Sequence, residues 1–173
     1  MSDERQIEKA RVFAMAAHAA VRQLRKYTND PYIVHPLAVA AKVALANGSD
    51  AMVCAALLHD VLEDTQVTEA TLRTEFGHEV TNLVVWLTHV EVPGNRSARK
   101  VAECKRLYGA PAEAQTIKLA DLLDNAASII KHDAKFAKVF LGEVRDLLMF
   151  LSQGDPELWA ELYEVWRANH EKV

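Results

Sequence analysis

Residues 55–65 read A-A-L-L-H-D-V-L-E-D-T, and we expect the rest of the chain to be organised around this stretch. Its first half is apolar enough for a buried helix, and its second half carries an imidazole and several carboxylates: His59, Asp60, Glu63 and Asp64. Side chains four positions apart share a helix face, so we expect His59 over Glu63 and Asp60 over Asp64. Buried charge requires compensation by a metal ion, a cationic partner or a water-filled cleft. The stretch therefore predicts a site at the end of a central helix.

The composition and the net charge limit the class of protein. Half of the 173 residues are apolar, and six Gly and five Pro are typical of a compact, mainly helical globule. A chain of this length buries roughly 70% of its unfolded surface, so we expect residues 1–173 to form a single domain. The net charge of −4 gives no general attraction to nucleic acid or to an anionic membrane.

The cysteines and the first residues of the chain indicate where the protein acts. Cys54 and Cys104 form no C-x-x-C pair, which favours a reducing compartment and argues against a zinc finger. The polar start M-S-D-E-R-Q-I-E-K-A lacks the apolar core of a signal peptide, and no apolar run approaches the roughly 20 residues that span a bilayer. We expect a cytoplasmic protein, and the sequence does not fix its oligomeric state.

The spacing of apolar residues predicts an all-α fold of about eight to nine helices around the site. The expected helices cover residues 3–26, 36–46, 50–62, 68–76, 80–88, 112–132, 136–153 and 156–171. His35 precedes Pro36, and a residue before proline is pushed away from helical geometry, so we expect His35 to be extended. Asp121 and Asn125 are expected to share a helix face. Asp121 is either a site residue or a surface charge on an amphipathic helix.

The candidate metal ligands come from three separate segments: His35, His59, Asp60 and Asp121. Two imidazoles and two carboxylates suit Mn²⁺, Fe²⁺, Zn²⁺ or Mg²⁺. On a six-coordinate ion this set leaves room for water and a substrate oxygen, which is the arrangement for metal-assisted hydrolysis of a phosphate ester. Glu63 and Asp64 can orient the water or move its proton without being ligands.

Five motifs in order resemble the HD phosphohydrolase superfamily: R-K, P-Y-I-x-H-P, A-L-L-H-D-x-x-E-D-T, F-G and I-K-L-A-D-x-x-x-N. The set is most similar to the hydrolase domain of RelA/SpoT-type stringent-response enzymes and to their stand-alone small alarmone hydrolases. This resemblance implies an HD-domain enzyme that removes pyrophosphate from the ribose 3′ position of guanosine tetra- or pentaphosphate, giving GDP or GTP.

The resemblance also implies roles for individual residues. The metal would be Mn²⁺, with other divalent ions as alternatives, and the ligands would be His35, His59, Asp60 and Asp121. The catalytic carboxylates beside the bound water would be Glu63 and Asp64. The purine nucleotide would be bound by Arg25 against the base, by Lys26 and Tyr32 lining the pocket, and by Asn125 at the ribose. A guanidinium stacks well on a base, although a helix C-terminus alone also favours cations.

One motif departs from the family pattern. The family often reads A-D-R-L-H-N-x-R-T where this chain reads A-D-L-L-D-N-A-A-S. Leu122 and Ala127 replace arginines, Asp124 replaces a histidine, and Ser128 replaces a threonine near the base edge. An adenosine 3′-pyrophosphate is therefore an alternative substrate. Another HD nucleotide phosphohydrolase and a non-enzymatic alarmone-binding module are further alternatives.

Overall fold

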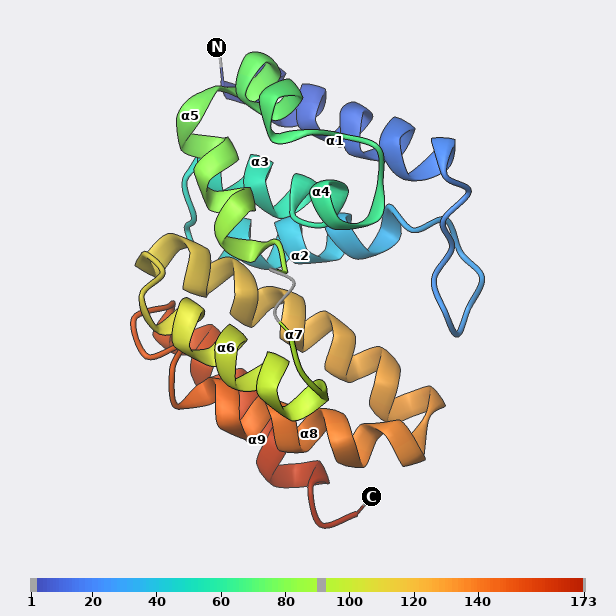
Figure 1. The fold of residues 1–173 in the computed structure, drawn as a ribbon, viewed down its shortest axis with the longest axis vertical. Coiled ribbons are helices and arrows are strands. Elements are labelled where there is room, and N and C mark those ends of the chain that lie inside the picture. Colours follow the sequence, from blue (N-terminus) through green and yellow to red (C-terminus); the bar gives the residue numbers. More distant parts are fainter. Residues whose placement is uncertain (1–2, 90–92, 173) are drawn as a thin grey trace. The chain divides into compact units, whose positions relative to one another are not determined.

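The computed structural model describes residues 3–89 and 93–172 (Figure 1). These described residues form helices α1 to α9, and their only β-structure is an isolated bridge between Leu24 and Pro31. The predicted all-α fold is confirmed. Contacts divide the chain into two compact units, Met1–Thr88 (unit 1) and His89–Val173 (unit 2). The single domain that we expected from the sequence stays a prediction.

Unit 1 is organised around an apolar central helix. Its helices are α1 (Asp3–Ala20), α2 (Val34–Leu45), α3 (Asp50–Leu58), α4 (Val61–Asp64) and α5 (Glu69–Leu87). In α3 every residue from Met52 to Leu58 is buried, as expected for a helix that is apolar on all sides. Helices α1, α2 and α5 pack against it (Figure 1). Gly77, with φ 79°, kinks α5 where the sequence predicts a stop.

The central helix ends earlier than the sequence predicts. The Ala56 carbonyl accepts a hydrogen bond from Nδ1 of His59 at 2.8 Å, and α3 ends at Leu58. His59 and Asp60 consequently lie in a turn between α3 and α4. The continuous helix expected over residues 50–62 was therefore wrong, because the imidazole binds a carbonyl of the preceding helical turn.

The first helix also ends early, at Ala20 rather than near residue 26. The N–H groups of Arg22 and Gln23 donate to the carbonyls of Ala19 and His18 at 3.0 and 3.1 Å, and Arg22 has φ 54°. This pattern is a Schellman motif, which most often has glycine at the left-handed position. Because arginine fills that position, no glycine marks the stop in the sequence.

The start of α2 also differs from the prediction. The helix begins at Val34, so His35 is helical and not extended. Pro36 is tolerated because the first-turn N–H groups have no partner within the helix. The imidazole of His35 therefore projects from the first turn of a helix.

Unit 2 is built on the long helix that carries Asp121. Its helices are α6 (Arg96–Tyr108), α7 (Ala112–His132), α8 (Ala134–Leu148) and α9 (Pro156–Asn169). Helix α7 matches the predicted 112–132, and it packs against α8 and α9 (Figure 1). The buried amide of Gln115 donates to the carbonyls of Leu107 and Ala110, both at 3.1 Å, and so fixes the start of α7.

Within the part of the chain that the structure describes, none of the helices has both the length and the apolar character needed to cross a bilayer.

Candidate active site

Three side chains converge around the turn between α3 and α4 in unit 1. The Oδ2 of Asp60 lies 3.1 Å from Nε2 of His59 and 3.8 Å from Nε2 of His35. The two imidazole rings lie edge to face, with centroids 5.1 Å apart. Both histidines are buried, whereas the Asp60 side chain is 21% exposed. Two ring nitrogens and a carboxylate oxygen thus face one another at the edge of unit 1.

The hydrogen bond of His59 to the backbone defines which ring nitrogen faces this cluster. A carbonyl oxygen only accepts, so Nδ1 of His59 must carry the proton that is donated to Ala56. In the neutral form of the ring, Nε2 presents a lone pair toward Asp60. A lone pair and a carboxylate oxygen at 3.1 Å repel each other unless a proton or a metal ion lies between them. This donor set therefore fits a divalent metal ion.

Two carboxylates around the turn, Asp60 and Asp64, accept hydrogen bonds from neutral side chains. The hydroxyl of Tyr32 donates to Oδ2 of Asp60 at 2.6 Å, so this residue, expected to line a nucleotide pocket, also contacts a candidate ligand. The amide of Gln23 donates to Oδ2 of Asp64 at 2.7 Å. Glu63 and Asp64 are both exposed on the short helix α4, directly after the buried cluster. Exposed carboxylates in this place are accessible to water and to a ligand.

The two basic residues of the R-K motif lie on the loop between α1 and α2. The guanidinium of Arg25 lies 5.9 Å from the ring centre of Tyr32. The ammonium of Lys26 lies 4.9 Å from the ring centre of Tyr27. Because Tyr32 bonds Asp60, Arg25 is connected to the cluster, while Lys26 is directed to a different ring.

Asp121 lies in unit 2, midway along α7, and is 6% exposed. Its Oδ2 accepts a hydrogen bond from the ammonium of Lys118 at 2.9 Å, and its Oδ1 accepts from the amide of Asn125 at 2.7 Å. The predicted shared face of Asp121 and Asn125 is confirmed. The alternative of a surface charge was wrong, because the carboxylate is buried and bonded on both oxygens. Ser128 follows on the same helix and is half-buried.

A second buried carboxylate of unit 2 lies beside the same lysine. Lys100 donates to Oε2 of Glu103 at 2.7 Å, and the ammonium of Lys118 lies 3.8 Å from Oε1. Burial opposes ionisation of Glu103, but the nearby charges of Lys118 and Lys100 outweigh it and lower the pKa of this carboxyl. Unit 2 thus pairs two buried carboxylates with lysines.

Gln23 contacts Asp64, although no sequence pattern singles it out as a site residue. Its position depends on the Schellman end of α1 and on the loop that follows, where the N–H of Tyr32 donates to the Gln23 carbonyl at 3.3 Å. A glutamine outside a helix has no periodic pattern that would reveal it. Only the three-dimensional path of the loop places its amide against Asp64.

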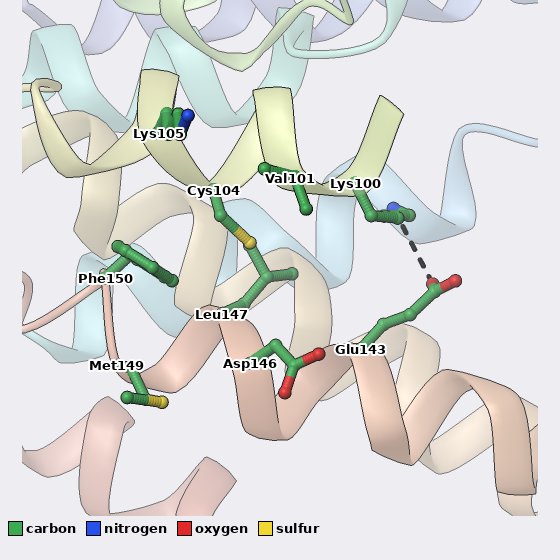
Figure 2. Close-up of a pocket in the computed structure, with 9 residues that line it drawn as sticks. All are labelled: Lys100, Val101, Cys104, Lys105, Glu143, Asp146, Leu147, Met149 and Phe150. Carbon is green, nitrogen blue, oxygen red and sulfur yellow. Dashed lines mark ion pairs between the residues drawn. The ribbon is translucent and has the colours of Figure 1, made fainter. Parts of the chain in front are cut away.

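A cavity of about 380 Å³ opens in unit 2 between α6 and α8 (Figure 2). Cys104 points into it from α6, and Glu143 lies across from Lys100, with 3.6 Å between the carboxylate and ammonium groups. Burial raises the pKa of the Cys104 thiol, which disfavours a nucleophilic thiolate. The described residues that line this cavity do not include any of the predicted site residues, so the cavity is separate from the predicted chemistry.

Comparison with known proteins gives matches that cover most of the chain. Residues 10–147 match the family model described as HD domain. A probable guanosine-3′,5′-bis(diphosphate) 3′-pyrophosphohydrolase of Mycoplasma pneumoniae is 39% identical over 61% of this chain and 16% of its own length. A guanosine-3′,5′-bis(diphosphate) 3′-pyrophosphohydrolase of Aquifex aeolicus is 37% identical over 72% of this chain and 18% of its own length. The chain thus spans less than a fifth of the curated relatives it matches.

Two solved structures share the fold. The structure of a metazoan ortholog of SpoT, described as hydrolysing ppGpp and playing a role in starvation responses, aligns with a TM-score of 0.86 at 24% identity and covers 94% of each chain. A crystal structure of a Listeria monocytogenes protein aligns with a TM-score of 0.72 at 26% identity, over 85% of this chain and 100% of that one.

Proposed function

The chain belongs to the HD domain family, and on that premise we propose that it is a metal-dependent hydrolase that removes pyrophosphate from the 3′ position of guanosine tetra- or pentaphosphate. The relatives from Mycoplasma pneumoniae and Aquifex aeolicus are named for this reaction, which supports the proposal. The resemblance of the five ordered motifs supports the same reaction.

The observation that carries the proposal is the cluster in unit 1. Nε2 of His35, Nε2 of His59 and Oδ2 of Asp60 face one another, and neighbouring groups orient both His59 and Asp60. These residues are the H and HD of the motif pattern. A merely structural ion pair would not need a second buried imidazole beside the carboxylate.

We assign the metal ligands as His35, His59, Asp60 and Asp121, and we propose Mn²⁺ as the ion. A bound divalent ion lowers the pKa of a coordinated water and polarises a phosphoryl oxygen. Asp121 enters the set because it is the aspartate of the I-K-L-A-D motif and because Asn125 already orients one of its oxygens. In this assignment Lys118 neutralises Asp121 in the metal-free protein.

Glu63 and Asp64 act on the proton chemistry. Both are exposed on α4 next to the ligand Asp60, where they can accept a proton from the attacking water and hold the water in line with the 3′ phosphorus. The backbone N–H of Asp64 donates to the backbone carbonyl of Asp60 at 2.9 Å, so the backbones of the two residues are joined across one helical turn.

We propose that the substrate is bound by basic and polar residues of the R-K, P-Y-I-x-H-P and I-K-L-A-D-x-x-x-N motifs and by Ser128. We place Arg25 against the purine, since its guanidinium already packs beside an aromatic ring. Lys26 and Tyr32 line the nucleotide pocket, Asn125 binds the ribose, and Ser128 lies near the base edge.

The test is release of pyrophosphate. Purified protein with Mn²⁺ is incubated with guanosine 5′-diphosphate 3′-diphosphate, and the products are separated by anion exchange. We expect GDP and pyrophosphate in equal amounts and none in the presence of a chelator. Orthophosphate in place of pyrophosphate would indicate another HD nucleotide phosphohydrolase, and tight binding without turnover would indicate an alarmone-binding module.

The base preference is tested in the same assay. Leu122 occupies a position where the related enzymes often carry arginine, and it is 5% exposed, so it packs in unit 2 and offers no charge to a phosphate. Ala127 likewise removes a basic side chain. These two positions favour testing the adenosine analogue beside the guanosine one. A higher kcat/KM with the adenosine 3′-pyrophosphate would move the assignment to that substrate.

A further inference from the structure

Two polar residues at the end of α1 form a chain of hydrogen bonds that leads to Asp64. The amide nitrogen of Gln23 donates to Oδ2 of Asp64 at 2.7 Å, and Oε1 of Gln23 lies 2.7 Å from Nδ1 of His18. His18 is 1% exposed, so the chain starts inside unit 1 and ends at an exposed carboxylate on α4. We propose that Gln23, supported by His18, is a positioning residue that sets the orientation of the Asp64 carboxylate.

The chemistry of the three groups fixes the direction of both bonds. A carboxylate has no proton to donate, so the nitrogen of the Gln23 amide must face Asp64. The amide oxygen therefore faces His18, and since that oxygen only accepts, Nδ1 of His18 must carry the proton. His18 and Asp64 thus hold the amide in one orientation, and a reversed amide would lose both bonds.

The backbone holds Gln23 as firmly as its side chain does. Its N–H donates to the His18 carbonyl at 3.1 Å, and its carbonyl accepts from the N–H of Tyr32 at 3.3 Å. Arg22, in the left-handed conformation, turns the chain so that Gln23 leaves α1 toward α4. The amide is therefore presented to Asp64 by a fixed turn and is not a flexible surface group.

The buried imidazole has an arrangement that stability alone does not explain. Nε2 of His18 has no hydrogen-bond partner among the residues that the structure describes. A buried nitrogen without a partner is unfavourable, and an apolar side chain would fill this position more stably. His18 also packs against Tyr32, with ring centroids 4.7 Å apart, and the Tyr32 hydroxyl binds Asp60. One imidazole therefore supports the partners of both Asp60 and Asp64.

This inference rests on the proposed function only for the role of Asp64 in turnover. A carboxylate held through Oδ2 keeps Oδ1 directed at the attacking water, so loss of the amide would lower kcat and leave KM and metal binding nearly unchanged. Groups that orient the ligands and carboxylates of a metal site commonly contribute about 10- to 100-fold in activity.

The experiment is a double-mutant cycle between Gln23→Leu and Asp64→Asn. We expect Gln23→Leu to lower kcat about 10- to 100-fold in the wild-type background and to have no further effect in the Asp64→Asn background. Gln6→Leu is the matched control, because among the described residues Gln6 in α1 donates only to the Phe76 carbonyl, at 3.4 Å, and we expect its kcat to be unchanged. A full rate in Gln23→Leu, or an equal loss in both backgrounds, would overturn the proposal.

A spectroscopic measurement tests the chain without any substrate. Nitrogen-15 NMR of the imidazoles should show His18 protonated on Nδ1 in the wild type and a changed pattern in Gln23→Leu. Protonation on Nε2 alone in the wild type would overturn the proposal, whatever the activity. If the wild type releases no pyrophosphate while His18 carries its proton on Nδ1, the proposed function fails and the hydrogen-bond chain stands.

Discussion

In unit 1, Asp60 and Asp64 accept hydrogen bonds from neutral side chains, whereas in unit 2 the buried Asp121 and Glu103 also accept hydrogen bonds from lysines. Asp60 accepts from the Tyr32 hydroxyl and Asp64 from the Gln23 amide. Asp121 and Glu103 accept from Lys118 and Lys100. A neutral donor orients a carboxylate and leaves its charge in place, while an ammonium group also neutralises it.

The difference concerns the charge compensation of the proposed metal ligands in each unit. The cluster of unit 1 combines two imidazoles with an oriented carboxylate, so it already has the composition that a divalent ion requires. In unit 2, Lys118 compensates the negative charge of the buried Asp121 when no ion is bound. Under the proposed function, binding of the ion would replace Lys118 as the main charge partner of Asp121.

The largest effect that would test this comparison is expected for Asp60→Ala. The change removes the carboxylate from the unit 1 cluster, so we expect loss of Mn²⁺ binding and a fall in kcat/KM of roughly 10³-fold or more. Calorimetric titration with Mn²⁺ and the pyrophosphate assay measure both. Asp50→Ala, at the opposite end of α3, is the control. Undiminished Mn²⁺ affinity in Asp60→Ala would remove this aspartate from the ligand set.

Glu63→Gln should separate binding of the metal from turnover. The amide keeps the size of the side chain but cannot accept the proton of the water, so kcat should fall about 10²- to 10⁴-fold with Mn²⁺ affinity unchanged. Initial rates and a metal titration on the same sample give both values. A variant with the wild-type rate would show that Glu63 has no part in the proton chemistry.

Lys118→Met should reveal the dependence of unit 2 on its lysine. Without the ammonium group, the negative charges of the buried Asp121 and Glu103 are less well compensated. The free energy of unfolding of the metal-free variant should therefore be about 2–3 kcal/mol lower than that of the wild type. Urea denaturation followed by circular dichroism measures this loss. Lys105→Met, an exposed lysine on α6, should change stability by less than about 0.5 kcal/mol. Equal effects of the two variants would contradict the role given to Lys118.

A smaller effect is expected for the pH dependence of the free energy of unfolding, through the ionisation of Glu103 in unit 2. The pKa of Glu103 in the folded chain lies below its ordinary value of 4.5, so the charge of this carboxylate stabilises the fold above that pH. The contribution is lost as the pH falls through the lowered pKa. Urea unfolding of the wild type and of Glu103→Gln should therefore differ at pH 7 and converge as the pH falls below about 4.5. A constant difference across this range would show that the carboxylate charge is not involved.

Much of the fold could be predicted because apolar spacing decides it. Helix α7 follows an apolar stripe and begins after Pro111, so its observed bounds equal those predicted from the sequence. The end of α1 could not be predicted, because an arginine adopts the left-handed conformation that glycine normally marks. The turn after α3 could not be predicted either, because it depends on the hydrogen bond from the His59 side chain to the Ala56 carbonyl.

The candidate ligands could be selected from the sequence, but the groups that contact them could not. The motif spacing selects His59 and Asp60, and the structure brings His35 to them from the start of α2. The partners of the carboxylates depend on the path of the loop after α1. Nothing in the local sequence shows that Gln23 reaches Asp64 or that Tyr32 reaches Asp60.

The most direct test of the central claim is a titration of the wild type and of Asp121→Asn with Mn²⁺, followed by electron paramagnetic resonance. The account predicts a single tightly bound ion in the wild type and a loss of affinity of at least about tenfold in Asp121→Asn, with the fold retained. Equal Mn²⁺ affinity in the two proteins would contradict the proposed assignment of Asp121 as a metal ligand.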